Sequence, residues 1–139
     1  MKISIGADHR GFALKEDIKS HFSTIDWLDV GTHSIDRTDY PVYAQSVVKS
    51  LTDGSSELGI LICGSGVGIA MAANRSKSIY AAVCWNADVA RTAKEHDAAN
   101  ILVLPADFVK ASEAYPIIDA WLKAEFKGGR YQERLDMID

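Results

Sequence analysis

Residues 60–68 read "ILICGSGVG", an apolar run that leads directly into a glycine-rich loop. A continuous apolar run such as residues 59–63 is typical of a strand buried on both faces of a parallel sheet. The small apolar residues at 69–73 predict a helix that packs closely on that sheet. A strand, a glycine loop and a helix in this order indicate an α/β fold.

The rest of the chain repeats this alternation of strands and helices. Apolar runs predict four further strands, at 2–7, 25–30, 79–84 and 101–104. Apolar residues at helical spacing predict helices over 11–22 and 87–96. Two further helices are predicted to begin after the capping residues Asp39 and Ser112, and a short helix is predicted in the tail. The pattern predicts one domain over residues 1–139, a three-layer αβα sandwich with a five-stranded parallel, Rossmann-like sheet.

The composition excludes several classes of protein. A chain of 139 residues that is 47% hydrophobic suits a single domain, and 15 basic against 19 acidic residues argue against a nucleic-acid partner. No apolar segment approaches the roughly 20 residues of a membrane span, and Met1 leads directly into a strand-like run, so we expect neither a membrane partner nor a signal peptide. Two cysteines are too few for a disulfide framework, which favours a reduced, cytoplasmic setting.

Chemically reactive residues follow the predicted strands, where ligands bind in parallel α/β sheets. Cys63 stands where the third strand meets the loop, and the loop opens a helix whose N-terminus carries a positive partial charge. Such a terminus favours a cysteine thiolate and can also stabilise an oxyanion on a substrate. Cys63 is therefore a candidate nucleophile or general base, the alternative being a small buried hydrophobe.

The glycines themselves are a weak sign of nucleotide binding. Gly64, Gly66 and Gly68 lack the last interval of the dinucleotide fingerprint, and no Lys-Ser/Thr pair follows as in a Walker A loop. The histidines and cysteines also lack the spacing of zinc ligands, so we expect no metal.

A second group of candidates precedes the fifth strand or lies in the tail. His96 is either an acid/base partner or a solvated cation at a helix end, and its position predicts the opposite edge of the sheet from Cys63. Arg130 and Arg134 are four residues apart, so they share one face of a helix. They could bind a phosphate or form a solvated surface pair.

Taken together, the segments resemble the sugar-phosphate isomerase family that contains ribose-5-phosphate isomerase type B and the galactose-6-phosphate isomerase subunits. The resemblance spans nearly the whole chain and is carried by "GADHRGFALK", "GTHSIDRTDYPVYA", "GILICGSGVGIAMAAN", "AVCWNADVARTAKEHDAANIL" and "IDAWLKAEFKGGRYQERL". Members of this family interconvert aldose and ketose phosphates through a cis-enediolate without a metal, so the resemblance implies no cofactor. They are dimers or tetramers whose active site is shared between two subunits.

The resemblance also implies a role for each candidate residue. Cys63 is the base that moves a proton between C1 and C2, and His96 helps to open the sugar ring. The remaining residues would bind the substrate: Asp8 and Tyr40 the sugar hydroxyls, Gly64, Ser65, Gly66, Val67 and Gly68 the enediolate, Asp97 the sugar, and His9, Arg130 and Arg134 the phosphate. A shared site removes the need for His96 and the arginines to come from the chain that supplies Cys63.

Two departures from the family pattern bear on the substrate. Asp97 stands where the family usually has Asn, and Asp107 stands where an Arg usually helps to bind the phosphate. They predict a preference for a sugar other than ribose 5-phosphate: another pentose, a tetrose or a hexose phosphate, or an unphosphorylated sugar. Two other interpretations stay open at this point, a flavodoxin-like nucleotide-binding domain and a cysteine hydrolase that uses Cys63 and His96.

Overall fold

The computed structural model describes all of residues 1–139. Five strands alternate with helices along the chain, as predicted. The elements are β1 (Lys2–Ala7), α1 (Phe12–His21), β2 (Asp26–Asp29), α2 (Tyr40–Thr52), β3 (Leu58–Cys63), α3 (Val67–Ala73), β4 (Ala81–Val83), α4 (Ala87–Asp97), β5 (Ile101–Pro105), α5 (Ala111–Lys123) and α6 (Arg130–Ile138).

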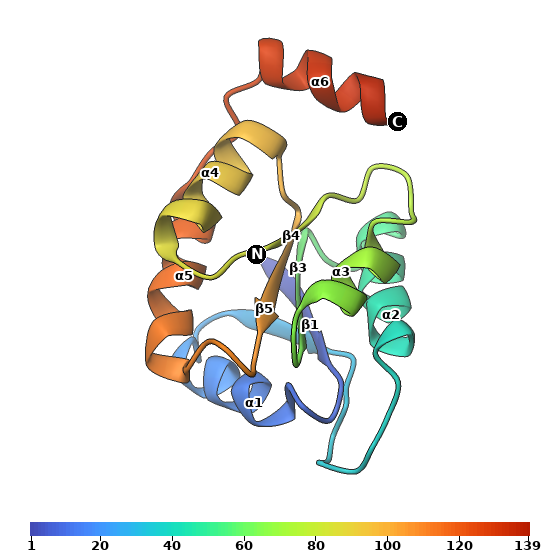
Figure 1. The fold of residues 1–139 in the computed structure, drawn as a ribbon, viewed down its shortest axis with the longest axis vertical. Coiled ribbons are helices and arrows are strands. Elements are labelled where there is room, and N and C mark those ends of the chain that lie inside the picture. Colours follow the sequence, from blue (N-terminus) through green and yellow to red (C-terminus); the bar gives the residue numbers. More distant parts are fainter.

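The strands form one parallel sheet in the order β2-β1-β3-β5-β4, which confirms the predicted sandwich. Helices α1, α4 and α5 cover one face of the sheet, and α2 and α3 cover the other (Figure 1). Helix α6 lies beyond the end of the sandwich, next to α4. No helix combines the length and the apolar character that crossing a bilayer requires.

Strand β3 shows why its apolar run is continuous. Ile60 and Ile62 pack in the core beneath α1, α4 and α5, whereas Leu61 and Cys63 pack in the core beneath α2 and α3. Successive side chains of a strand point to opposite faces, so a central strand covered on both sides needs apolar residues at every position. The Cys63 side chain is thereby directed to the same side of the sheet as α3.

A buried ion pair holds α1 against the carboxyl end of β2. The Lys15 side chain is fully buried, and its Nζ lies 2.6 Å from Asp29 Oδ2. Burial raises the pKa of Asp29, but hydrogen bonds from Lys15 and Lys19 outweigh that effect, and the net pKa is lowered. The other oxygen of Asp29 accepts the Gly31 N–H at 2.9 Å, which fixes the loop that follows β2.

Two predicted details are wrong. Ser112 does not cap α5, because the helix begins at Ala111 and the Glu113 carboxylate accepts the backbone N–H of Lys110 at 3.1 Å. Strand β4 is shorter than predicted, since it lies at the edge of the sheet and pairs only with β5. The Tyr80 N–H donates instead to the Asn100 side chain at 2.8 Å, and regular pairing starts only at Ala81.

Candidate active site

A pocket of about 320 Å³ opens at the carboxyl edge of the sheet. Its volume lies within the usual range for small-molecule sites. The residues that line it come from the carboxyl ends of β1, β3 and β5, from the loops that follow them and from the starts of α2 and α3: Asp8, Arg10, Tyr40, Cys63, Gly64, Ser65, Gly68 and Asp107. Most of the candidates expected at this edge therefore meet in one place.

The thiol of Cys63 sits inside the turn between β3 and α3. Its Sγ accepts the N–H of Gly66 at 3.2 Å, and the side chain is buried except for its share of the pocket wall. Gly66 is the N-cap of α3 and has a φ of 75°, a left-handed conformation that glycine adopts without strain. The turn therefore directs a backbone donor at the sulfur and fixes its position in the pocket wall.

Three other N–H groups of the loop are free to bind a ligand. The N–H groups of Gly64, Ser65 and Gly68 form no hydrogen bond with the protein, and all three residues line the pocket. The N–H of Val67 is taken by the Ser65 hydroxyl at 3.1 Å, and that of Gly66 by the thiol. Of the five residues expected to hold an oxyanion, three thus offer an available backbone donor.

Asp8 and Tyr40 form the neighbouring wall. Asp8 Oδ1 accepts the backbone N–H groups of Arg10 and Gly11 at 3.0 and 3.2 Å, while Oδ2 has no protein partner. The Tyr40 ring lies directly on Gly68, since a Cβ built there would be 2.7 Å from Tyr40 Cζ. A carboxylate oxygen and a phenol are both suited to sugar hydroxyls.

His9 lies beside this pocket without lining it. Its Nδ1 accepts the backbone N–H of Thr38 at 3.3 Å, so in the neutral ring the proton is on Nε2. This contact ties the residue after Asp8 to the loop that precedes α2. It leaves Nε2 as a donor for a ligand.

One wall of the pocket contains an ion pair that was not predicted from the sequence. Arg10 Nε and Nη2 donate to Asp107 Oδ1 and Oδ2 at 3.3 and 2.5 Å. The pair lies on Gly64, where a Cβ would be 2.6 Å from Arg10 Nε and 2.7 Å from Asp107 Oδ2. Arg10 follows β1 and Asp107 follows β5, the two strands on either side of β3, so it is the order of strands in the sheet that brings them together.

The second group of candidates lies at the amino edge of the sheet. His96 ends α4, and its ring stacks on Tyr131 of α6 with the centroids 4.4 Å apart and the planes 5° from parallel. Arg130 Nη2 donates to the Tyr131 hydroxyl at 3.3 Å, and this contact lowers the pKa of the Tyr131 phenol. Arg134 Cζ lies 5.7 Å from the same ring. The arginines expected to share a helical face do so.

Asp97 is exposed next to His96 but belongs to a different hollow. It lines an apolar pocket of about 380 Å³ beneath α6, with Leu135 and Ile138 among its neighbours. Within one chain, the structure therefore brings Asp97, His96 and the two arginines to one edge and Cys63 to the other. This is the separation that the chain direction predicts, because all five strands are parallel.

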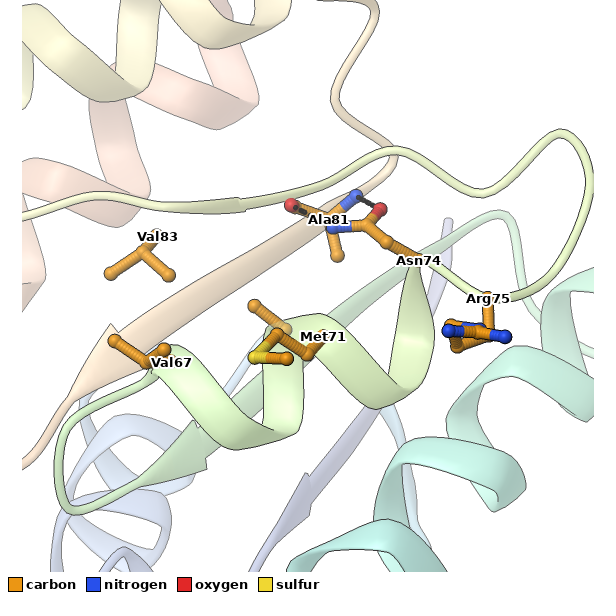
Figure 2. Close-up of a pocket in the computed structure, with 7 residues that line it drawn as sticks. Val67, Met71, Asn74, Arg75, Ala81 and Val83 are labelled. Atoms are coloured by element: carbon orange, nitrogen blue, oxygen red, sulfur yellow. Dashed lines mark hydrogen bonds between the residues drawn. The ribbon is translucent and has the colours of Figure 1, made fainter. Parts of the chain in front are cut away.

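A larger hollow runs along α3 and the edge strand β4. This groove of about 480 Å³ is lined by Val67, Ala70, Met71, Asn74, Arg75, Ala81 and Val83. Figure 2 shows Val67 and Met71 on α3 facing the β4 side chains, and Met71 is 66% exposed. Asn74 binds both the N–H and the C=O of Ala81 at 2.8 Å. The groove is apolar, and it begins at Val67, next to the Cys63 loop.

Nowhere in the structure do three or more His, Cys, Asp or Glu side chains converge as metal ligands would. The chemistry available to these residues comes from the thiol, the imidazole, the carboxylates and the backbone donors. The absence of a cofactor stays a prediction.

Comparisons with known proteins agree on one family. The model of the Ribose/Galactose Isomerase family matches residues 3–138. Ribose-5-phosphate isomerase B of Escherichia coli is 42% identical over 139 residues, which is 99% of this chain and 93% of the relative. A putative sugar phosphate isomerase of Rickettsia bellii is also 42% identical, over 99% of this chain and 96% of its own length.

Solved structures give the same result. A ribose 5-phosphate isomerase from Thermotoga maritima superposes with a TM-score of 0.97 at 44% identity, covering 99% of this chain and 97% of that one. Ribose-5-phosphate isomerase B from Mycoplasma genitalium, solved with bound ribulose-5-phosphate, has a TM-score of 0.94 at 43% identity, covering 99% and 93%.

Proposed function

The chain belongs to the Ribose/Galactose Isomerase family, and we propose that it interconverts ribose 5-phosphate and ribulose 5-phosphate or a closely related pair of sugar phosphates. In reaction class it is a sugar-phosphate isomerase acting between aldose and ketose. The observation that carries the finer proposal is the pocket in which the Cys63 thiol and three unpaired N–H groups lie together. Family membership favours this function over the nucleotide-binding and hydrolase interpretations.

The proposed chemistry is a proton transfer between two carbons. The Cys63 thiolate removes the proton from C2 of the open-chain aldose, and the electron pair forms the C1–C2 double bond and leaves a negative charge on O1. The free N–H groups of Gly64, Ser65 and Gly68 are arranged to stabilise that charge. The O2 proton then passes to O1, and the thiol returns its proton to C1, which leaves the ketone at C2. No step in this scheme requires a metal.

We further propose that each active site is shared by two copies of the chain. The proton-transfer pocket has no free arginine of its own, since Arg10 is paired with Asp107. Arg130 and Arg134, which have no carboxylate partner, lie with His96 at the other edge. A second copy would bring its His96 to open the sugar ring and its two arginines to bind the phosphate.

The apolar groove along α3 and β4 is the surface that suits this second copy. A two-fold axis perpendicular to α3 would place the two grooves against each other with the chains antiparallel. The carboxyl edge of one sheet would then adjoin the amino edge of the other. Exposed Met71 and Val67 would be buried, as expected of an obligate interface. A homodimer is the smallest assembly with complete sites, and a homotetramer of two such dimers fits the same proposal.

The two cysteines, Cys63 and Cys84, are both free. Free thiols persist in reducing compartments. We therefore propose the cytoplasm as the setting of this enzyme.

The identity of the sugar depends on how Asp107 acts. Its carboxylate is neutralised by a two-point contact with Arg10, so it does not present an isolated negative charge to a phosphate. This pairing weakens the argument that Asp107 excludes ribose 5-phosphate. The preference for another sugar remains a prediction that a substrate panel decides.

The experiment is a panel of tetrose, pentose and hexose phosphates and free sugars, assayed by ketose formation with and without a chelator. We expect turnover of ribose 5-phosphate that is unchanged by the chelator, with exchange of the C2 hydrogen into deuterated water. A panel with no turnover of any sugar phosphate would overturn the proposal. Loss of activity in the chelator would overturn its metal-free chemistry, and faster turnover of another sugar would support the prediction made from Asp97 and Asp107.

A further inference from the structure

Tyr131 lies between the imidazole of His96 and the two arginines of α6. One contact is the nearly parallel stack on His96, with a centroid separation of 4.4 Å. The others are Arg130 Cζ and Arg134 Cζ, 5.2 and 5.7 Å from the Tyr131 ring centroid, within the range of cation–π attraction. Tyr131 is the one side chain that contacts all three groups.

Helix α6 is otherwise held at a few points. Leu135 is its one buried residue, α4 is the helix that it packs against, and Asp139 at its C-terminal end is hydrogen-bonded to the segment before β4. The linker before it is tied to α4 where the Lys127 N–H donates to the Glu95 carbonyl at 3.0 Å. The stack of Tyr131 on His96 is therefore a principal link between α6 and the end of α4. A shift of Arg130 and Arg134 carries Tyr131 with it, since all three lie within five residues of one helix.

We infer that Tyr131 is a positioning residue that transmits the occupancy of Arg130 and Arg134 to the imidazole of His96. The inference rests on the proposed function. An anion held by the two arginines fixes the first turn of α6, and the Tyr131 ring then fixes the plane of the imidazole. The phosphate of the substrate thereby contributes to ring opening as well as to binding, because binding energy at a remote group is used to orient a reacting one.

Ring opening separates the two directions of the reaction. An aldopentose 5-phosphate is cyclic in solution and must be opened. The corresponding 2-ketose cannot close a five-membered ring, because its O5 carries the phosphate. A misplaced His96 should therefore lower kcat with saturating cyclic aldose more than kcat with saturating ketose, since the ketose can still form an open-chain aldehyde that closes after release. The values of kcat/KM must change equally in both directions, because the equilibrium constant is fixed.

The kinetic test compares Tyr131→Leu, which removes the ring, with Tyr131→Phe, which keeps it. We expect Tyr131→Leu to lower kcat from the aldose about 10- to 100-fold, with a much smaller loss from the ketose, because small misplacements of a reacting group are costly. Tyr131→Phe keeps the stack and should retain most of the activity. An equal loss in both directions, or no loss, would overturn the inference.

A spectroscopic test addresses the same link without substrate. A stacked phenol shifts the ring protons of His96 upfield in NMR spectra, and a His96→Gln variant assigns the signal. Inorganic phosphate should move this signal in the wild-type protein and in Tyr131→Phe, and not in Tyr131→Leu. A phosphate response that is unchanged in Tyr131→Leu, or absent in the wild type, would overturn the inference. A wild-type protein that shows the response but turns over no sugar phosphate would instead overturn the proposed function alone.

Discussion

At the carboxyl edge of the sheet, backbone holds the candidate groups in place, whereas at the amino edge they are partly or fully exposed side chains that contact one another. Cys63 is fixed by the N–H of Gly66, and Tyr40 is pressed against Gly68. His96 and Arg130, in contrast, are oriented mainly by Tyr131, a side chain of the terminal helix. We therefore expect the first edge to be rigid within one chain and the second to have room to adjust.

The difference between the two edges fits the proposal that one edge carries out proton transfer and the other recognises the substrate. Proton transfer needs a base and an oxyanion site in fixed geometry, and buried backbone supplies that. Recognition of a flexible, charged substrate tolerates movement, and arginines on a helix suit it. Substitutions at the carboxyl edge should therefore cost more than substitutions at the amino edge.

The largest expected effect is at Cys63. Cys63→Ser should lower kcat by about 10³-fold, since a hydroxyl is a far weaker base than a thiolate and general-base catalysis is worth 10²- to 10⁴-fold. The control is Cys84→Ala: burial raises the pKa of the Cys84 thiol to about 12, and this residue packs in the opposite core. Steady-state kinetics measures kcat for both variants, and thermal unfolding shows whether each variant is folded. Near-normal turnover by Cys63→Ser would contradict the expectation that substitutions at the carboxyl edge cost more than substitutions at the amino edge.

Mixing two inactive variants tests whether the edges belong to one site. Cys63→Ser and His96→Ala chains, unfolded together and refolded, should regain about a quarter of the wild-type activity assayed from the cyclic aldose, because half of the dimers are mixed and each holds one intact site. The control is each variant refolded alone. No recovery in a sample shown to contain mixed dimers would mean that the two edges do not cooperate.

A smaller effect is expected where Tyr40 packs on Gly68. Gly68→Ala should destabilise the protein by about 1–3 kcal/mol, since the new methyl group would overlap the phenol ring. In an unobstructed helix the same change stabilises by about 1 kcal/mol, so the sign is informative. Denaturant unfolding measures it, and adding Tyr40→Ala should remove the penalty. A stabilised Gly68→Ala protein would show that this edge is less tightly packed than the structure indicates.

The smallest effect is expected at the ion pair between Glu95 and Lys127, which links α4 to the segment before α6. Glu95 Oε2 lies 3.3 Å from Lys127 Nζ. Desolvation raises the pKa of Glu95, but the Lys127 hydrogen bond and nearby cations lower it overall. The ion pair is therefore present at neutral pH and is lost only as the pH falls below the ordinary carboxyl range.

Glu95→Gln should raise KM about two- to threefold with kcat nearly unchanged, because an ion pair in which Lys127 remains exposed contributes little. Asp53→Asn, which removes one carboxylate from the exposed Lys49–Asp53 pair on α2, is the matched control. Initial rates at low and high salt measure both variants. A large fall in kcat for Glu95→Gln would mean that the amino edge is as rigid as the other.

Much of this arrangement could be predicted because it follows from local pattern and chain direction. The apolar run over 59–63 and the helical spacing of Ala44, Val47 and Val48 gave the correct elements. The opposite placement of Cys63 and His96 followed from parallel strands alone. The Ser112 prediction was wrong because the helix begins earlier, with Lys110 as its N-cap, and the Glu113 side chain accepts the backbone N–H of Lys110.

Contacts between distant segments could not be predicted. Arg10 meets Asp107 across 97 positions of sequence, and Tyr131 meets His96 although β5 and α5 lie between them in the chain. Pairing of this kind depends on the order of strands in the sheet and on where a terminal helix docks. A single sequence gives no signal for either.

The sequence by itself determined the layered α/β fold, the strand that presents Cys63 and the edge at which each candidate residue emerges, because these depend on periodicity and chain direction over a few residues. Only the tertiary structure decided which backbone donors remain free, that Arg10 is occupied by Asp107 and that Tyr131 joins the imidazole to the arginines. Free donors and side-chain partners depend on packing to within a fraction of an ångström between segments far apart in the chain, and local sequence does not encode such distances.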